Sequence, residues 1–492
     1  MEILLTLIYL LLFIWLISGS PFFKLDGIPR IWISLAFLLK VIAGVLFWYI
    51  YTFYYTSRSD ADIYKYFDDS KILFDALKNN PQDFIRMFFG FDNDPRFYEQ
   101  YYAHMQVWKP QFESAVSMES HTMIRLNVVF RFFSFGFYQL HNVFVNFLSF
   151  AGLVALYKTF VPYAADKRKF LFPAIFLPPT VLFWGSGLIR ESLVFFTMGF
   201  SVYFCHKLIT EKLSWKTVVW SVLFLWLLLI SKIVLCGLLI IGFVAWGISL
   251  HMLKRVPVLN FILAGVIAFT GLLLLAQFTG RNYFRVMQVK QVDLINVSNG
   301  GYYLVNGNKM IYIAYDKRDA SLEMLRDSTY KIKPGSDYYY YNQPDSKDTI
   351  YVHNSTDTLA YKLFSSSAPS KTKFPIPLLT EDKWSFIKTA PRAFFVALAR
   401  PFIWEAKNNL QRLAAIENIL LMLAGLFCLI FADRTVFAKP AFWFCILMVV
   451  CFYCMIGWVT PFFGGLVRYK AVVFPFLMSA LTIMFKRSKM SK

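Results

Sequence analysis

Sequence motifs of several large classes of enzymes and transporters are absent from this chain of 492 residues. It contains no GxxxxGK[ST] loop, no GxGxxG after a predicted strand, no HExxH, no GxSxG and no cluster of histidines. Their absence argues against nucleotide-driven transport, Rossmann-type chemistry, zinc proteolysis and serine hydrolysis. The sequence accordingly predicts no cofactor and no metal site, and it leaves a requirement for a divalent metal open.

Cysteines and acidic residues are also few. All six cysteines lie inside apolar runs, so none is placed to cross-link a water-exposed loop, and we interpret CFYC at 451–454 as buried packing. The 50 Lys and Arg residues outnumber the 30 Asp and Glu residues, which gives a net charge of +20. The basic residues occupy short loops between apolar runs, where they act as topology signals, so we expect no nucleic-acid partner.

Long hydrophobic runs are what the sequence has in abundance. It is 58% hydrophobic and 19% aromatic, with a mean hydropathy of +0.51. These values predict an all-α polytopic membrane protein with about 11 transmembrane helices. We expect the spans near 1–19, 31–55, 137–160, 170–186, 188–206, 216–231, 234–250, 257–278, 409–431, 440–458 and 468–485.

The loops between these spans alternate in charge. One alternate set, which ends with the tail KRSKMSK, contains 16 Lys or Arg and four acids, so we expect it to be cytoplasmic. The N-terminus and both long loop segments then lie on the outer side, which we take to be that of a bacterial inner membrane. We read the first helix as a retained span rather than a signal peptide. The predicted divisions are transmembrane helices in 1–55, 137–278 and 409–485, a first extracytoplasmic loop in 56–136, a second extracytoplasmic segment in 279–408, and a basic cytoplasmic tail in 486–492.

The first extracytoplasmic loop begins with the acidic motif DADIYKY at 60–66. Asp60 is the first candidate for catalysis and Asp62 the second, because a carboxylate beside a span can meet a substrate whose lipid tail stays in the bilayer. The alternative is a helix start, in which Ser59 caps the helix and the two aspartates occupy its positive end. The aromatic clusters that follow suit either sugar faces or an interfacial belt.

Further ionisable residues fall at the same predicted outer face. Ionisable groups at the edge of a span are costly, so each carries a functional hypothesis, although headgroup contacts and ion pairs within the bundle explain them too. Two lie in the apolar stretch 122–136, which we expect to lie in the interface, and two follow the broken helix and glycine turn of PPTVLFWGSGLIRES. The predicted substrate-binding residues are Arg125, Arg190, Glu191, Lys232, Arg400, Glu405, Arg468 and Tyr469.

The second extracytoplasmic segment changes character between about 279 and 384. Polar residues alternate with β-branched and aromatic residues, and NG, GN and PDS turns separate the runs. This pattern predicts a small β-rich insert. We interpret His353, its only histidine, as a surface residue, and we expect an amphipathic stretch to lead back to a span through Arg400.

Four short motifs resemble those of the GT-C superfamily of polytopic glycosyltransferases and of the related Wzy-type polymerases of bacterial surface polysaccharides. They are DADIYKY at 60–66, FWGSGLIRES at 183–192, RPFIWEA at 400–406 and GGLVRYKAVVFPFL at 464–477. The resemblance implies a polyprenyl-phosphate-linked donor and a general base in the first outer loop, a role that falls on Asp60, with Asp62 as the nearest substitute. The chain departs from many GT-C enzymes in having two predicted spans before that loop.

We therefore expect a membrane glycosyltransferase that moves sugar from a polyprenyl-phosphate-linked donor to a surface glycan or lipid acceptor. In the expected inverting step Asp60 deprotonates the acceptor, and Arg190 and Arg468 bind the phosphate leaving group. The expected partners are a lipid-linked sugar or oligosaccharide, a glycan acceptor and membrane lipids. The alternatives are a Wzy-type polymerase of lipid-linked repeat units and, in another class, a non-enzymatic glycan transporter or scaffold subunit.

Overall fold

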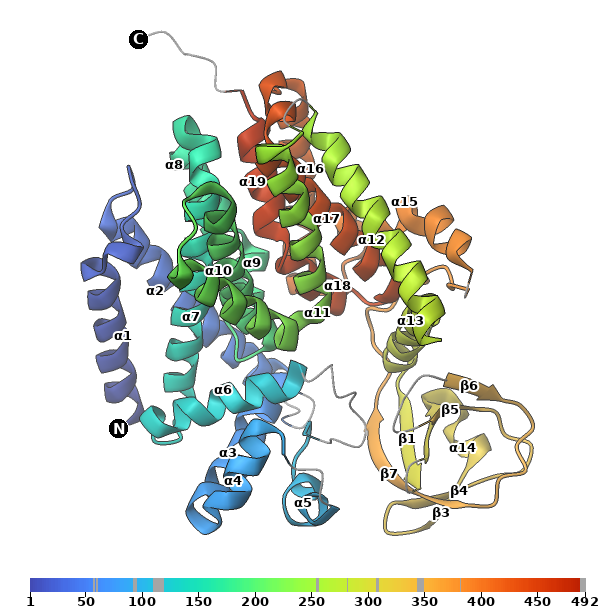
Figure 1. Cartoon of the computed structure of the whole chain (residues 1–492). Coiled ribbons are helices and arrows are strands. Elements are labelled where there is room, and N and C mark those ends of the chain that lie inside the picture. The colour runs from blue at the N-terminus through green and yellow to red at the C-terminus, as the bar shows by residue number, and fades with distance from the viewer. Residues whose placement is uncertain are drawn as a thin grey trace.

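The computed structural model describes residues 1–55, 58, 61–91, 95–108, 119–253, 256–280, 282–306, 309–342, 349–380 and 382–486. Most of these residues form a bundle of helices, and a small antiparallel sheet lies at one end of the bundle (Figure 1). The short helices outside the main elements are Pro21–Phe23, Tyr102–His104, Val161–Lys167, Tyr315–Lys317, Ile403–Glu405 and Arg434–Ala438.

Eight helices in the described part of the chain are long and apolar enough to cross a membrane, in agreement with the expected multi-pass membrane protein. A ninth span is possible if two short helices, Phe463–Ala471 (α18) and Phe474–Met484 (α19), count as one that bends by 59°. The predicted number of about 11 is not confirmed. The eight are Glu2–Gly19 (α1), Arg30–Tyr54 (α2 and its π-helical end), Tyr138–Ala164 (α7 and the turn after it), Arg190–Thr210 (α10), Trp215–His251 (α11), Pro257–Thr279 (α12), Asn409–Ile430 (α16) and Pro440–Val459 (α17).

The segment expected as a span at 170–186 is broken into two short helices, Arg168–Phe176 (α8) and Pro179–Trp184 (α9). Pro178 lies between them with an extended backbone, φ −55° and ψ 131°. A residue that precedes a proline is forced out of the helical region, and Pro179 exerts this effect on Pro178. The double proline therefore ends one helix and starts the next.

Helix α11 contains two segments that the sequence predicts as separate spans. Its backbone leaves the helical region at Lys232, with φ −162° and ψ 81°. Across this break the Cys236 thiol donates a hydrogen bond to the Leu225 carbonyl at 3.5 Å. Because two residues 11 positions apart would be separated by about 16 Å along a straight helix, the chain folds back at Lys232.

The first long loop segment folds into helices at the end of the bundle where the N-terminus lies (Figure 1). The helices are Asp62–Asn79 (α3), Pro81–Phe89 (α4), Pro95–Gln100 (α5) and Glu119–Ser134 (α6), and α6 lies across the bundle end. The Asp69 carboxylate on α3 accepts the backbone N–H groups of Gln106, Val107 and Trp108. Arg131 on α6 donates to Ser70 and to the Phe67 carbonyl, and these contacts fix α3 on α6.

The β-rich insert is present as a sheet of seven described strands, all paired antiparallel, in the order β3-β4-β7-β1-β2-β5-β6. Helix Tyr283–Asn299 (α13) leads into it, and Gly300 adopts φ +68° where a Cβ would lie 2.5 Å from the Ala368 backbone. Only glycine allows the sheet to begin there. The elements are Gly301–Asn306 (β1), Lys309–Ala314 (β2), Arg318–Ser321 (α14), Leu322–Arg326 (β3), Thr329–Ile332 (β4), Tyr338–Asn342 (β5), Thr349–Val352 (β6) and Ala360–Ser367 (β7), and Lys383–Ala399 (α15) returns to the bundle.

Helices α3 to α6 and the sheet lie at the N-terminal end of the bundle, and α19 ends at the opposite end (Figure 1). At that opposite end the loops of the basic set contact one another. Lys167 donates to the carbonyls of Ile483 and Phe485, and Lys439 donates to the carbonyl of Tyr163. The long loop elements and the basic loops therefore lie at opposite ends of the bundle, in agreement with the alternation of charge in the sequence. Which end faces the cytoplasm stays a prediction.

Candidate functional site

Arg468 on α18 lies between two carboxylates from distant parts of the sequence. Its Nη1 atom donates to Asp62 Oδ2 on α3 at 2.6 Å, and its Nε atom lies 2.8 Å from Glu191 Oε1 on α10. The second contact is an ion pair whose N–H is poorly aligned with the carboxylate. Glu191 is buried, whereas 32% of the Asp62 side chain is exposed. We call Asp62, Arg190, Glu191 and Arg468 the Arg468 cluster.

The loop between α9 and α10 is held from two other helices. The Lys40 ammonium on α2 donates to the Gly185 carbonyl at 2.5 Å and contacts the Ser186 hydroxyl at 3.3 Å. From α7, Ser149 donates to the Gly185 carbonyl and Asn146 donates to the Ser186 carbonyl, both at 2.9 Å. Helix α10 begins directly after this loop, so these contacts position its first two residues, which belong to the cluster.

The charges of the cluster keep Asp62 ionised. Burial alone would raise the pKa of Asp62, but Arg468 and Arg190 outweigh it and hold that pKa below its ordinary value. Tyr66 follows four residues later, one helical turn along α3, and burial raises the pKa of its hydroxyl. At neutral pH the cluster therefore presents a carboxylate that can accept a proton beside a phenol that can donate a hydrogen bond.

Two more cations and an aromatic ring surround the cluster. The Lys232 ammonium, at the break in α11, lies 5.7 Å from the centre of the Tyr469 ring. Lys290 on α13 pairs with Asp293 at 3.4 Å, and it also lies within electrostatic range of Arg190 and Tyr469. The site therefore offers an anionic ligand several positive charges from separate helices.

Six of the predicted site residues meet here, and three others among the described residues lie elsewhere. Asp62, Arg190, Glu191, Lys232, Arg468 and Tyr469 are the six, whereas Asp60 lies outside the described residues.

The remaining three residues make separate contacts. Arg125 lies over the Trp108 ring at 4.9 Å and donates to the Met87 carbonyl. Arg400 pairs with Glu405. Arg400 and Glu405 pair within their own short segment, whereas tertiary packing brings Trp108 and Met87 to Arg125, so none of these residues reaches the Arg468 cluster.

Sequence reasoning did not single out Tyr66 or Lys290. Tyr66 could have been found, because it lies within DADIYKY at a spacing of four from Asp62, which places both on one helical face. Lys290 carries no such signal. It lies on a polar helix, where a lysine is an ordinary solvated residue.

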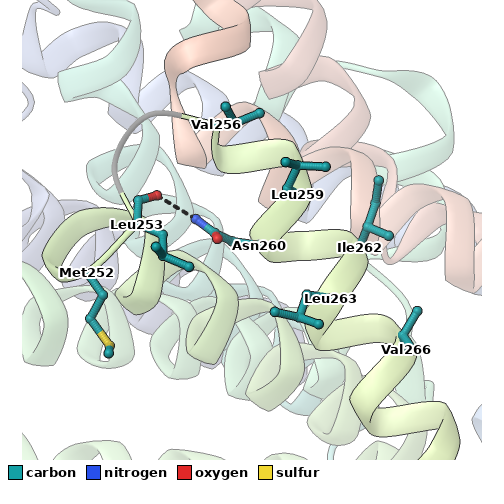
Figure 2. A pocket seen from close by; sticks show the side chains of 8 residues that line it. All are labelled: Met252, Leu253, Val256, Leu259, Asn260, Ile262, Leu263 and Val266. Atoms are coloured by element: carbon teal, nitrogen blue, oxygen red, sulfur yellow. Dashed lines mark hydrogen bonds between the residues drawn. The ribbon is translucent and has the colours of Figure 1, made fainter.

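A metal centre and an apolar surface groove are two other kinds of site that such a bundle could form. No group of three or more His, Cys, Asp or Glu side chains that could hold a metal occurs among the described residues. A well-formed surface groove lies at the junction of α11 and α12, and its lining is apolar except for Asn260, which donates to the Leu253 carbonyl at 2.7 Å (Figure 2). The described residues that line the groove carry no charge, so the Arg468 cluster is the stronger candidate for a site.

Comparison of the chain with protein-family models, with curated proteins and with solved structures gives no match.

Proposed function

We propose that this protein is a membrane glycosyltransferase that acts at the outer face of a bacterial inner membrane. It transfers sugar from a polyprenyl-phosphate-linked donor to a surface glycan or lipid acceptor. The observation that carries the proposal is the Arg468 cluster, in which the partly exposed, ionised Asp62 lies beside two arginines at the end of a membrane bundle. An ionised carboxylate beside cations suits proton transfer from a hydroxyl and departure of a phosphate.

In the proposed step Asp62 takes the proton of an acceptor hydroxyl. The hydroxyl oxygen forms a bond to the anomeric carbon while the bond from that carbon to the phosphate oxygen breaks and its electron pair leaves with the phosphate. We assign Arg190, Lys232 and Lys290 to the leaving phosphate. Arg468, fixed between two carboxylates, orients Asp62 for the proton transfer.

A polymerase of Wzy type is the second candidate. The cations at the site include three besides Arg468, namely Arg190, Lys232 and Lys290, and they come from three different helices. That number suits two phosphate groups, as in a pyrophosphate-linked repeat unit. The two candidates share the site and differ in the donor.

The test is a transfer assay on purified protein in lipid, with polyprenyl-monophosphate and polyprenyl-pyrophosphate glycans as donors. We expect Asp62→Asn to lower transfer about 100-fold or more, since general base catalysis contributes about 10²- to 10⁴-fold. Asp75→Asn is the matched control, because Asp75 lies on the same helix in an exposed pair with Lys78. Laddered products from the pyrophosphate donor would establish the polymerase.

Full transfer by Asp62→Asn would remove this residue from the mechanism. No product from any donor, with wild-type protein that is shown to be folded, would favour a transporter or a scaffold subunit.

A further inference from the structure

Four tyrosines form a continuous row across one face of the sheet. Tyr303 on β1 pairs in register with Tyr312 on β2, Tyr312 with Tyr339 on β5, and Tyr339 with Tyr351 on β6. Residues directly opposite on neighbouring strands share a face of the sheet, so their side chains are adjacent. The successive ring centres are 5.0, 6.3 and 4.8 Å apart. We call these four residues the tyrosine row.

The second member of the row is buried, and its last member is exposed. Tyr312 is 2% exposed, and its hydroxyl lies within hydrogen-bonding distance of the carbonyls of Asn296 and Gly300 at the end of α13. Tyr351, on the last strand in the order, is 39% exposed, and the His353 ring lies 4.3 Å away, edge to face. Aromatic surface therefore continues from the helix that carries Lys290 to open solvent.

Polar groups border the exposed end of the row. The Asp337 carboxylate accepts a hydrogen bond from the Tyr351 hydroxyl at 3.3 Å and from the backbone N–H of Asn354 at 3.2 Å. His353 Nδ1 lies 3.4 Å from the same carboxylate, and Lys317 Nζ lies 4.0 Å from it. One carboxylate faces one ammonium, so this border has hydrogen-bonding capacity with little net charge.

We propose that the exposed end of the row, formed by Tyr339, Tyr351, His353 and Asp337, binds a neutral glycan chain. Aromatic rings cover the apolar faces of sugar rings, and a carboxylate accepts hydrogen bonds from their hydroxyls. The balance of charge favours a neutral glycan over an acidic one.

The position of the row fits an acceptor glycan that reaches the Arg468 cluster. Lys290 precedes Asn296 by six residues on α13, which is about 9 Å along the helix axis. The sheet also lies at the same end of the bundle as α3 (Figure 1). The role as an acceptor site rests on the proposed function, whereas glycan binding itself requires no transfer and is measured separately.

The test uses the full chain in lipid nanodiscs and immobilised maltohexaose and chitohexaose, two neutral hexasaccharides, with binding followed by biolayer interferometry. We expect at least one hexasaccharide to bind, and we expect Tyr339→Ala with Tyr351→Ala to weaken that binding about tenfold or more. The double variant Tyr339→Phe with Tyr351→Phe keeps the rings and is expected to bind within about threefold of wild type. Trp384→Ala is the matched control, since Trp384 is 55% exposed on α15.

Tyr351→Ala alone, at an exposed position of an edge strand, replaces the double alanine variant if that variant does not fold. Unchanged binding by a folded alanine variant, or no binding of either hexasaccharide by wild type, would overturn the proposal. Transfer of one sugar to a short acceptor, measured in parallel, separates the two hypotheses. Its absence in wild type counts against the proposed function, whereas weakened hexasaccharide binding in the alanine variant supports the glycan surface in either case.

Discussion

Arg468 and Lys470 are two residues apart on α18, yet they belong to different environments. Successive residues on a helix are about 100° apart, so these two side chains leave nearly opposite faces. Arg468 meets two carboxylates, one of them partly exposed. Lys470 is 1% exposed and donates to the Asn418 side-chain oxygen at 2.6 Å.

The two environments suggest different roles. Lys470 also donates to the Arg400 carbonyl, and Asn418 in turn donates to the carbonyls of Ala399 and Pro401. Glu417, the acid nearest to Lys470, is occupied by the backbone and hydroxyl of Thr180. These contacts tie α18, α16 and the α9 region together without reaching solvent. A buried basic residue with neutral hydrogen-bond partners stabilises packing, whereas one that shares an exposed carboxylate can serve a ligand.

Among the variants that test the comparison of Arg468 with Lys470, Arg468→Gln is expected to have the largest effect. It leaves the buried Glu191 charge without its partner, and loss of one member of a buried ion pair costs about 3–5 kcal/mol. Transfer should fall about 100-fold or more, because Asp62 loses the partner that orients it, and a small misplacement of a catalytic group can cost about 100-fold. Thermal unfolding in lipid measures the first change and the transfer assay the second.

The double variant Arg468→Gln with Glu191→Gln separates stability from activity. It removes the unpaired buried charge, so we expect most of the lost stability to return while transfer stays low. Arg412→Gln is the control, since Arg412 is exposed on α16. Wild-type stability and transfer in Arg468→Gln would show that the cluster has neither role.

Lys470→Met should give the opposite pattern to Arg468→Gln. The side chain keeps a similar length, but the Asn418 oxygen and the Arg400 carbonyl lose a donor, which costs about 1–3 kcal/mol. We expect transfer per folded molecule to stay within about twofold of wild type. A loss of transfer in folded Lys470→Met would remove the distinction between the two faces.

The amino-acid sequence predicts the class of fold well because its signals are local. Apolar runs indicate spans, and alternating residues indicate the sheet. Lys232 interrupts an apolar run where α11 folds back. The strand order is not predictable in this way, since β1 pairs with β7 through Gly301 and Ser367, far apart in the chain. Local signals also fail at the double proline at 178–179. Whether the broken segment counts as a span depends on how α8 and α9 pack, and the sequence does not show this packing.

The sequence predicts only part of the candidate site, because it reveals charged residues beside spans but not their tertiary contacts. Ionisable residues beside spans are costly, so Arg190 and Arg468 could be recognised from the sequence and from the alternation of loops. Arg125 shows the same signal, yet its partners are Trp108 and Met87, which only tertiary packing brings to it. Lys290 shows no signal, because its role arises from the path of α13 past the cluster. The contacts that a side chain makes, rather than its residue type, therefore decide whether it belongs to the site.

Lys40 combines features of the packing residue Lys470 and of the cluster residue Arg468. Of the variants proposed, Lys40→Met is expected to have the smallest effect. Like Lys470 it is 1% exposed and bonded to neutral groups, but those groups belong to the loop that leads into Arg190. Ser149 still donates to the Gly185 carbonyl, so we expect a loss of only about 1 kcal/mol, and a shift of the loop should lower transfer several-fold. Leu39→Met, at an exposed position beside it, is the control. If Lys40→Met loses stability but transfers sugar as fast as wild type, Lys40 belongs with Lys470 as a packing residue, and the loop does not set the position of the cluster.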